Sequence, residues 1–456
     1  MNDSTTPQQP AQANSLYGGL ISAQGLDLDR FASIQTQVQA WTTEAGTTVK
    51  FVEARGLPIV DVILRFRAGT VQDTAHPGLA ALTLYMLDEG SHQYTATQQA
   101  EHIERLGAII AKQIRLEHAT LSLRSLNTQA VLGPALALFT DLVANPAFAS
   151  SALEKIKKQL LQSNAARERR AELRARSEAF RHLFNGHPYG CPLGATEEGV
   201  AAVTTGDLRA FHQRAYSASN LEMVVVGDLS LAEAQALSRQ LSQALPQGWS
   251  ATDLPVVPAA TPATINIEQP GTSSAVLLAL PLNVPANDPQ FPALVLASDI
   301  LGEGLESRLM VELRERRGLT YGVYSHLSPL RAGGLFTVEW KIAPAHAEGT
   351  QELVMTLLRD FIEQGPTQAE LQLARKQLEG QLLRGVAQNK RLAALLAELS
   401  HQRQPDDHLN TYIERINRLT PADVRAAMQR HLDLSYRVKV SVGPRVEQQP
   451  LPAPDQ

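Results

Sequence analysis

The strongest constraint on the fold of this chain is an internal repeat. The segment TTGDLRAFHQRAYSASNLEMVVVG (204–227) aligns without a gap on TPADVRAAMQRHLDLSYRVKVSVG (420–443). Each copy has the pattern of a capped helix, a turn and an apolar strand that ends in glycine. Two amphipathic helices can resemble one another by chance, but chance does not carry one constant offset through helix, turn and strand. The chain is therefore expected to contain one folding unit twice.

The two halves also begin alike. LPIVDVILRFRAG (57–69) and SSAVLLALPLNVP (273–285) are typical of apolar strands, and each is followed by a turn and a helix. That helix ends in LDEG (87–90) in the first half and in LGEG (301–304) in the second. The expected fold class is therefore α+β, with two homologous domains that are each a curved, mainly antiparallel sheet with helices on one face.

The longest helical signal covers residues 367–402. It opens with Thr367 and Glu370, which form the capping-box pattern that supplies acceptors to unpaired backbone amides. Gly380 and Gly385 lie inside this segment, and glycine weakens a helix interior. We therefore expect the helix to bend or break at these glycines.

A chain of 456 residues is too long for one ordinary core, and about two or three domains are expected. The clearest linker is LPQGWSATDLPVVPAATPA, which is rich in proline and small residues. The predicted divisions are a disordered or extended N-terminus (1–27), an N-terminal domain (28–244), the linker (245–263), a C-terminal domain (264–446) and a C-terminal tail (447–456).

Composition excludes several classes of protein. The net charge of −5 argues against a nucleic-acid-binding protein, which would carry a basic face. A single cysteine, Cys191, rules out an internal disulfide framework and a four-cysteine zinc site. No apolar run of about eighteen residues is present, so we expect no transmembrane segment. The polar N-terminus lacks the apolar core of a signal peptide, which fits either a cytoplasmic start or a chain whose signal peptide has been removed.

Several ordered motifs characterise the first half. These are FVEARGLPIVDVILRFRAGT (51–70), HPGLAALTLYMLDEGS (76–91), IERLGAIIA (103–111), HPYG (187–190) and NLEMVVVGDLS (220–230). Their order and spacing resemble the pitrilysin or insulinase family of zinc peptidases, the inverzincins, and the resemblance covers almost the whole chain. It implies that each half is a copy of the duplicated α/β roll of these metallopeptidases.

Active members of that family carry H-x-x-E-H on the helix after the first strands. Its two histidines lie on one helical face and bind zinc, and the glutamate activates a bound water. The aligned positions here are Ala81, Leu84 and Tyr85, and the family's downstream carboxylate ligand falls near Gln162 or Ser163. Methyl and isobutyl groups donate no lone pair, and a neutral phenol is a poor zinc ligand. We therefore expect the helix to keep an apolar stripe, at i, i+3 and i+4, that packs against the sheet.

No other group of residues is predicted to replace the metal site. His76, His92, His102 and His118 lie nearby in the sequence, and His102 is expected to face solvent on a helix whose apolar positions lie elsewhere. His187 of HPYG is expected in a turn. No metal ligand is therefore assigned in this chain.

The second half keeps a different part of the family pattern. In ESRLMVELRERRGLTYGVYSHL (306–327), Arg314 and Tyr321 stand seven residues apart, with Gly318 suited to end a helix between them. RERRG alone is also typical of a solvated basic helix end, and the two arginines directly before the glycine are assigned to the surface on that ground. The resemblance implies substrate-binding roles for Arg314 and Tyr321, because a guanidinium offers donors to peptide carbonyls and a phenol can steady a developing oxyanion.

Missing zinc ligands beside a preserved arginine–tyrosine pair resemble the non-catalytic subunit of two-domain bacterial members of the family. The resemblance implies a heterodimer in which a homologous partner carries H-x-x-E-H and the zinc. This chain would contribute Arg314 and Tyr321 to a shared chamber for peptides or unfolded polypeptides. Two alternatives stay open: a structural or assembly subunit with the same fold, and an active enzyme with an unorthodox metal site. Bacterial relatives of this kind are often exported, so the periplasm is the expected location, ahead of the cytoplasm.

Overall fold

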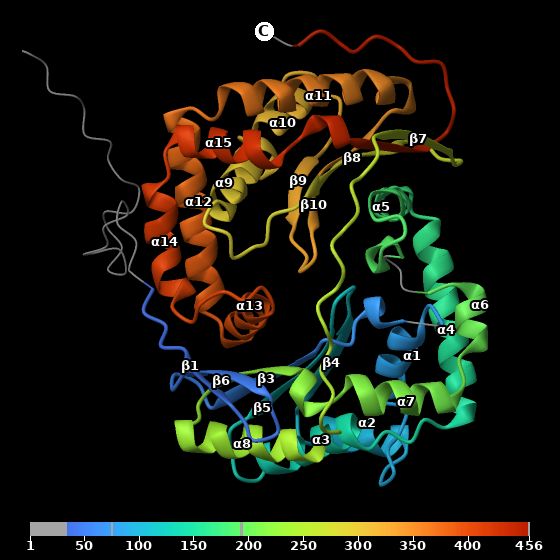
Figure 1. The fold of residues 1–456 in the computed structure, drawn as a ribbon, viewed down its shortest axis with the longest axis vertical. Helices are drawn as coiled ribbons and strands as arrows, with labels where there is room; N and C mark the ends of the chain where they lie inside the picture. The colour runs from blue at the N-terminus through green and yellow to red at the C-terminus, as the bar shows by residue number, and fades with distance from the viewer. Residues whose placement is uncertain (1–33, 74–75, 192–194, 455–456) are drawn as a thin grey trace, which may run out of the picture.

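The computed structural model describes residues 34–73, 76–191 and 195–454, so the predicted N-terminal stretch 1–27 lies outside the described residues. The N-terminal half lies at the bottom of Figure 1 and the C-terminal half at the top, and each is built on one sheet. Helices cover the outer face of each sheet, and further helices lie between the two sheets.

The N-terminal sheet has six strands in the order β1-β2-β6-β3-β5-β4. The strands are β1 (Gln39–Thr42), β2 (Thr48–Glu53), β3 (Ile59–Phe66), β4 (Ile109–Ile114), β5 (Ala119–Leu126) and β6 (Leu221–Gly227). β2 and β6 run parallel, and the other neighbouring pairs are antiparallel. β3 and β6 are buried on both faces, whereas β5 alternates between buried and half-exposed residues because one of its faces is open.

The C-terminal sheet has five strands in the order β7-β11-β8-β10-β9. They are β7 (Ala263–Glu268), β8 (Ser274–Leu282), β9 (Val323–Ser328), β10 (Gly334–Ile342) and β11 (Val438–Gly443). This is the order of the N-terminal sheet without β1, and β7 and β11 form the parallel pair, as β2 and β6 do in the first half. The predicted α+β fold with two homologous, mainly antiparallel sheets is confirmed.

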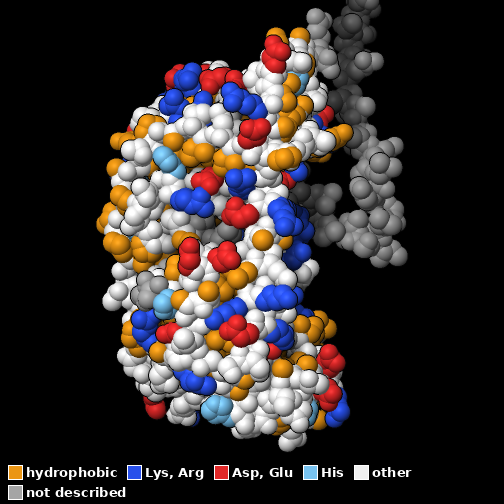
Figure 2. Space-filling view, turned by 90° about the vertical axis from the view of Figure 1, so that its right-hand side faces the viewer, with side chains coloured by type: hydrophobic (Ala, Val, Ile, Leu, Met, Phe, Trp, Pro, Cys, Tyr) orange, Lys and Arg blue, Asp and Glu red, His pale blue; other side chains and the backbone are white. Residues whose placement is uncertain are grey.

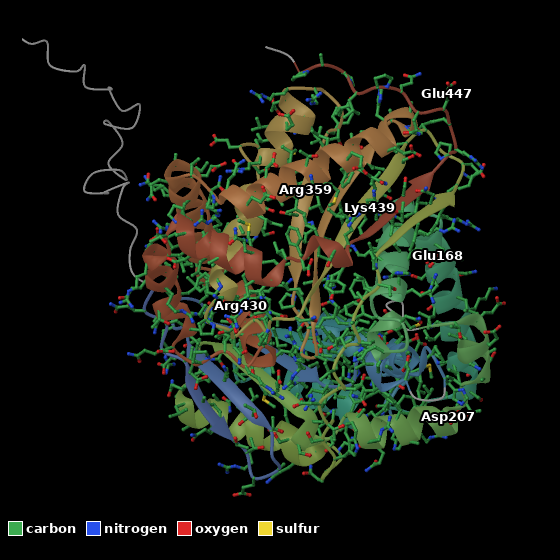
Figure 3. The ribbon with its side chains drawn as sticks, turned by 45° about the horizontal axis from the view of Figure 1, so that its top comes forward. Glu168, Asp207, Arg359, Arg430, Lys439 and Glu447 are labelled. Atoms are coloured by element: carbon green, nitrogen blue, oxygen red, sulfur yellow. The ribbon has the colours of Figure 1, made fainter. Side chains whose placement is uncertain are left out.

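The helices follow the same repeat. Those of the first half are α1 (Leu79–Met86), α2 (Ala96–Arg105), α3 (Leu132–Ala144), α4 (Ser150–Glu168), α5 (Ala171–Leu183), α6 (Glu197–Ala202), α7 (Thr205–Ala215) and α8 (Leu231–Ala244). Those of the second half are α9 (Phe291–Gly302), α10 (Arg308–Met310), α11 (Ala347–Gln364), α12 (Gln368–Val386), α13 (Asn389–His401), α14 (His408–Arg418) and α15 (Pro421–His431). α7 and α15, the helices of the sequence repeat, each begin with a capping box. Asp207, which completes the box of α7, is marked in Figure 3.

Each half covers the inner face of the other half's sheet with one helix. α5 of the first half packs on β8 and β11, and α13 of the second half packs on β3 and β6. Leu183 of α5 is buried with Val440 of β11, and Leu396 of α13 is buried with Val224 of β6. Both helices lie between the two sheets in Figure 1. The halves therefore share their apolar cores, and α5 and α13 are called the exchanged helices below.

The predicted break of the long helix falls elsewhere. α12 runs unbroken through Gly380 and Gly385, and α13 begins at Asn389, so the predicted break at the two glycines is wrong. The break matches the junction of the first half, where Glu168 (Figure 3) ends α4 and Ala171 begins α5. Its position follows the repeat, because α13 has to leave its own half in order to reach the opposite sheet.

The segment between the halves is held in place by hydrogen bonds. Residues 246–262, all of which the structure describes, contain neither helix nor strand and join α8 to β7. The guanidinium of Arg67 donates to the carbonyl of Ala251 (2.6 Å), and the His187 ring lies 3.0 Å from the carbonyl oxygen of Pro255. This part of the chain is therefore packed on the first half as it crosses to the second.

The outer surface is mixed in charge. Figure 2 shows acidic and basic side chains interspersed over one face of the molecule. Within the part of the chain that the structure describes, no helix has the length and apolar character needed to cross a membrane. The C-terminal tail runs past α11 (Figure 1), where the N–H of Gln449 donates to the carbonyl of Ala345 (2.7 Å).

Candidate functional site

The helix aligned with the family's zinc-binding helix is α1. Ala81 and Leu84 are buried in the core of the first half, at 1% and 0% exposure, as the apolar stripe predicts. Tyr85 is partly buried against the same core, and the Lys112 ammonium lies 5.5 Å from the centre of its ring. Burial raises the pKa of the Tyr85 phenol, so the group stays protonated near neutral pH. The three side chains therefore act in packing.

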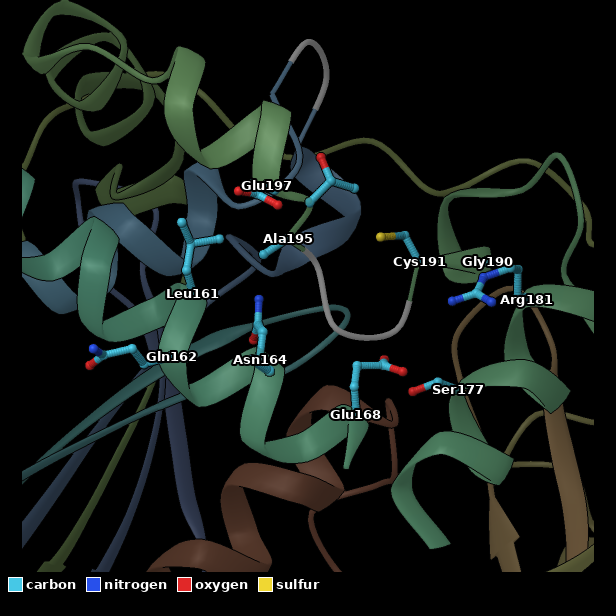
Figure 4. A pocket seen from close by; sticks show the side chains of 12 residues that line it. Leu161, Gln162, Asn164, Glu168, Ser177, Arg181, Gly190, Cys191, Ala195 and Glu197 are labelled. Atoms are coloured by element: carbon cyan, nitrogen blue, oxygen red, sulfur yellow. The ribbon is translucent and has the colours of Figure 1, made fainter. Parts of the chain in front are cut away.

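The position of the family's third ligand lines a cavity of about 550 Å³ between α4, α5 and α6. Gln162 or Ser163 stands at that position, and Gln162 and Asn164 of the same helix are labelled in Figure 4. A zinc ion needs several donors at about 2 Å, but the aligned positions of α1 and α4 offer only a protonated phenol and either a neutral amide or a neutral hydroxyl. These residues do not fit a zinc ion. Across the described residues, no group of three or more His, Cys, Asp or Glu is placed to hold a metal ion.

Two histidines of the first half contact neighbouring residues in ways that give them structural roles. His102 is partly exposed and lies beside Tyr94, with the ring centres 5.1 Å apart. His187 does lie in a turn, where its ring accepts a hydrogen bond from the N–H of Tyr189 (3.2 Å). Both rings therefore stabilise local structure.

Arg314 and Tyr321 flank a turn in the second half. α10 continues into a wider, π-type turn at Val311–Glu315, which places Arg314 at the helix end. Gly318 ends this helix in the left-handed conformation (φ 58°), as predicted, and its N–H donates to the Arg314 carbonyl (3.0 Å). Val323 then begins β9. The spacing seen in the sequence thus becomes one helix end, one turn and one strand start.

The Arg314 side chain binds the backbone of Tyr321. Its Nη1 donates to the Tyr321 carbonyl (3.2 Å), and its Nε lies 3.3 Å from the Glu315 carboxylate. The Tyr321 ring is 96% exposed, so its hydroxyl is open to an incoming group. A Cβ at Gly322 would lie 2.8 Å from the Tyr324 hydroxyl, so a side chain there would require the exposed Tyr324 ring to shift. The turn therefore holds hydrogen-bond donors that can bind a carbonyl oxygen or an oxyanion.

Both side chains line one groove of about 790 Å³, which we call the Arg/Tyr groove. Strands β8 and β10 form its floor, and residues 318–322 with Tyr324 form one wall. Glu172 and Ala175 of α5 form another wall, although α5 belongs to the first half of the chain. The groove is therefore complete only when the exchanged helix α5 is docked on the opposite sheet.

Two ion pairs join α5 to the floor of the Arg/Tyr groove. Nζ of Lys341 lies 2.5 Å from the Glu172 carboxylate, and Arg176 donates to both carboxylate oxygens of Glu339 (2.7 and 2.9 Å). The hydrogen bond from Lys341 lowers the pKa of Glu172. Both lining carboxylates are thus already paired. Among the described residues, Arg314 pairs with Glu315, which lies outside the lining, and with no carboxylate of the groove itself.

The sequence-based prediction omits part of this groove. Glu172 and Ala175 lie far from Arg314 in the sequence, and only the exchange of helices brings them together. Tyr324 also lines the groove and is absent from the prediction; it lies on the exposed face of β9 beside His326, which is outside the lining, with ring centres 6.3 Å apart. The alternation in VYSHLS does signal an exposed strand face, and it could have indicated these two residues.

A buried polar cluster, which we call the polar junction, joins the halves beside α13. The Glu117 carboxylate accepts hydrogen bonds from His401 (3.0 Å), from the Tyr189 hydroxyl and from the N–H of Arg331 (2.9 Å). His118 lies next to it, with its ring 4.8 Å from that of His401. Burial would raise the pKa of Glu117, but the hydrogen bond and charge of His401, together with the hydrogen bonds from Tyr189 and Arg331, outweigh burial and lower the pKa. Each half thus supplies partners that the buried groups of the other half need.

Two such sheets, joined by exchanged helices, define the class of two-domain metallopeptidase-like proteins. Comparison with family models agrees with this class. The model described as insulinase (peptidase family M16) matches residues 51–197, and the model described as peptidase M16 inactive domain matches residues 202–378. The chain belongs to the M16 peptidase family.

Its relatives include both peptidases and a non-peptidase by name. A solved structure described as a peptidase M16 inactive domain from Pseudomonas fluorescens is 36% identical, covers 91% of this chain and 100% of that chain, and has a TM-score of 0.88. An uncharacterized zinc protease of Mycobacterium leprae is 27% identical over 386 residues, which are 82% of this chain and 84% of the relative. The non-peptidase homolog YmxG of Helicobacter pylori is 26% identical over 341 residues, 74% of this chain and 78% of the relative. The inactive-domain and non-peptidase names fit an inactive chain of the M16 type.

Proposed function

We propose that this chain is the non-catalytic subunit of a heterodimeric zinc peptidase. The observation that carries the proposal is that Arg314 and Tyr321 line one groove, while the aligned metal-binding positions of α1 and α4 hold no zinc ligand. A homologous partner subunit supplies H-x-x-E-H and the zinc, and the two chains enclose one chamber. The match to an inactive M16 domain and the similarity to a non-peptidase homolog support this division of labour.

The part of this chain is to hold the peptide. A guanidinium has five N–H donors, of which one in Arg314 binds the Tyr321 carbonyl. Nε of Arg314 faces the Glu315 carboxylate, the remaining donors are available to peptide carbonyls, and the exposed Tyr321 hydroxyl can donate to an oxyanion. The zinc of the partner subunit, when bound, polarises the scissile carbonyl. A chamber that excludes water would strengthen each of these polar contacts.

Capture of the tagged chain from its native cells tests the proposal. The eluate is assayed for chelator-sensitive hydrolysis of an unfolded fluorogenic peptide, and the zinc content of the separated subunits is measured. We expect activity to arrive with a second protein of similar size that contains the zinc, and to be absent from this chain alone. Untagged cells processed in parallel supply the background.

Two results would overturn the proposal. Peptide hydrolysis by this chain alone would require a metal site within it. A stable partner without any peptidase activity would favour the structural or assembly subunit, which shares the fold but needs no substrate groove.

A further inference from the structure

The first half carries a groove at the position that corresponds to the Arg/Tyr groove. It has a volume of about 340 Å³ and lies on the inner side of the N-terminal sheet, bordered by β3, β4, β5 and α13. Lys390 and Ala393 of α13 line it, just as Glu172 and Ala175 of α5 line the Arg/Tyr groove. In each exchanged helix these are the second and the fifth residue. The internal repeat therefore relates the two grooves.

The two related grooves differ in charge. The lining of the Arg/Tyr groove balances two carboxylates with two cations: Glu172, Glu339, Arg314 and Lys341. The lining of the first-half groove, which we call the basic groove, has four cations and one carboxylate: Arg65, Lys112, Arg124, Lys390 and Asp61. The second residue of the exchanged helix is thus a carboxylate in α5 (Glu172) and an ammonium group in α13 (Lys390).

Two of these cations are paired with carboxylates from outside the lining. Arg65 lies 3.1 Å from the Glu398 carboxylate, and Lys112 binds Asp88. These pairs hold the edges of the groove together. They leave the other two cations as the source of its excess positive charge.

Arg124 and Lys390 share one carboxylate. Arg124 lies 3.2 Å from Asp61, whose side chain is buried. Lys390 also acts on Asp61 through its charge, but it forms no ion pair with any residue of the described chain. One positive charge in the basic groove is therefore left without a direct partner.

Local helix stability does not explain Lys390. It is the second residue of α13, where the helix dipole favours an anion over a cation. Glu172, the corresponding residue of α5, follows that preference. Lys390 is exposed, so its ammonium group can reach a ligand in the groove. Apart from its effect on Asp61, this ammonium group is free of close polar contacts within the described part of the chain and is available to a ligand.

The lining of the basic groove also holds unused hydrogen-bonding groups. Nε of Arg65 and Oγ1 of Thr120 are buried and find no partner among the residues that the structure describes. Arg65 is 7% exposed, so water does not surround its guanidinium. A buried donor without an acceptor destabilises a protein, so these two groups add polar character to the wall of the groove.

We propose that the basic groove binds an acidic segment of a peptide, with a side-chain carboxylate between Lys390 and Arg124. Charge-assisted hydrogen bonds from ammonium and guanidinium groups favour a carboxylate over a neutral amide of the same shape. A groove of about 340 Å³ on the sheet face has room for a short extended segment but not for a folded domain. The inference concerns binding by this chain alone, so it holds or fails independently of a peptidase partner.

Fluorescence anisotropy of labelled peptides tests this site on the full chain. A glutamate-rich peptide should bind about tenfold more tightly than its glutamine counterpart, and added salt should weaken the binding. Lys390→Glu should remove this preference and favour a lysine-rich counterpart. Arg359→Glu makes the same change in net charge on the exposed side of α11, where Figure 3 marks Arg359, and should leave the affinity unchanged.

Each other outcome contradicts the proposal. Equal binding of the glutamate and glutamine peptides would mean that the groove does not recognise acidic side chains. Equal losses of affinity in Lys390→Glu and Arg359→Glu would mean the same. Loss of binding on amidation of the peptide C-terminus alone would mean that it reads a chain end. Equally tight binding of an oligonucleotide would indicate general attraction of anions. The melting temperature of Lys390→Glu should match the unmodified chain, because a glutamate suits the start of α13, and a large decrease would make this variant unsuitable and leave Lys390→Gln to decide.

Discussion

The two halves share one backbone plan and differ in the side chains placed on it. Both have the same strand order, both start their repeat helix with a capping box, and both cover the opposite sheet with one helix. In the first half, α1 presents an apolar stripe to the core. In the second half, the turn from Arg314 to Tyr321 presents donors to a groove. The repeat therefore determines where grooves form, and single residues determine what each groove can bind.

The contact between a helix end and an edge strand shows the same contrast on a smaller scale. Gly302 ends α9 against β9, where a Cβ would lie 2.5 Å from the backbone nitrogen of Ser325. At the corresponding place of the first half, Asp88 follows α1 and binds Lys112 of β4. One half thus uses close backbone packing where the other uses an ion pair at the surface.

The polar junction should be the most sensitive contact between the halves. Glu117→Ala would remove the acceptor for three buried donors, among them His401 and Tyr189. Breaking a buried, charged hydrogen-bond cluster by removing one partner costs about 3–5 kcal/mol, so we expect a decrease of that size in the free energy of unfolding. Urea denaturation measures it.

A matched variant checks that the effect belongs to the junction. Glu363→Ala removes an exposed carboxylate from α11 and should change the free energy of unfolding by less than about 0.5 kcal/mol. Similar losses in the two variants would show that the halves do not depend on Glu117.

Substitutions at the two helix–strand contacts should lower the stability by smaller amounts that differ between the halves. Gly302→Ala forces a Cβ into the backbone of β9 and should destabilise the protein by about 1–3 kcal/mol. Asp88→Ala removes a partly exposed ion pair and should cost less than about 1 kcal/mol. Thermal denaturation of both variants tests the difference. Equal losses would mean that the two contacts are equivalent despite their chemistry.

Acid should weaken the polar junction gradually. Burial lowers the pKa of His118 well below its usual value of about 6.5, and the charges of Arg65, His401 and Arg115 add to this effect. The unfolded chain therefore binds a proton below about pH 6.5 that the folded chain does not bind. The contribution of neutral His118 to the free energy of unfolding is fully present above that pH. It is lost as the pH falls, by up to about 1.4 kcal/mol per pH unit.

Melting temperatures between pH 5 and 7.5 test this dependence. His118→Gln cannot be protonated and should show a shallower loss of stability than the unmodified chain. His92→Gln changes an exposed histidine and should leave the loss as it is. An unchanged slope in His118→Gln would place the acid sensitivity in other buried groups.

Much of the fold could be predicted because local signals and the repeat agree. The threonine–aspartate caps of α7 and α15 and the apolar strands after them have the predicted form. The glycine stop at Gly318 also has a local cause, since the left-handed conformation suits glycine. The break at Gly380 and Gly385 was predicted wrongly, because tertiary packing of α13 on the opposite sheet decides where the helix ends.

The site could be predicted only in part. The spacing of Arg314 and Tyr321 predicted these two residues as a pair, and both line one groove. Glu172 and Lys390 could not be found in this way, since each completes a groove in the opposite half. Helix exchange of this kind leaves no periodicity in the sequence, and it becomes visible only when both sheets are in place.

The most direct test of the account is the kcat/KM for peptide hydrolysis by the assembled heterodimer with substitutions in this chain. Arg314→Ala and Tyr321→Phe together should lower kcat/KM by at least about 100-fold, because hydrogen bonds to charged groups contribute about 1.5–3 kcal/mol each. Arg316→Ala removes a nearby exposed arginine that binds Glu312, and should leave kcat/KM within about twofold. An unchanged kcat/KM in the double variant, with the heterodimer intact, would contradict a role of this chain in holding the substrate.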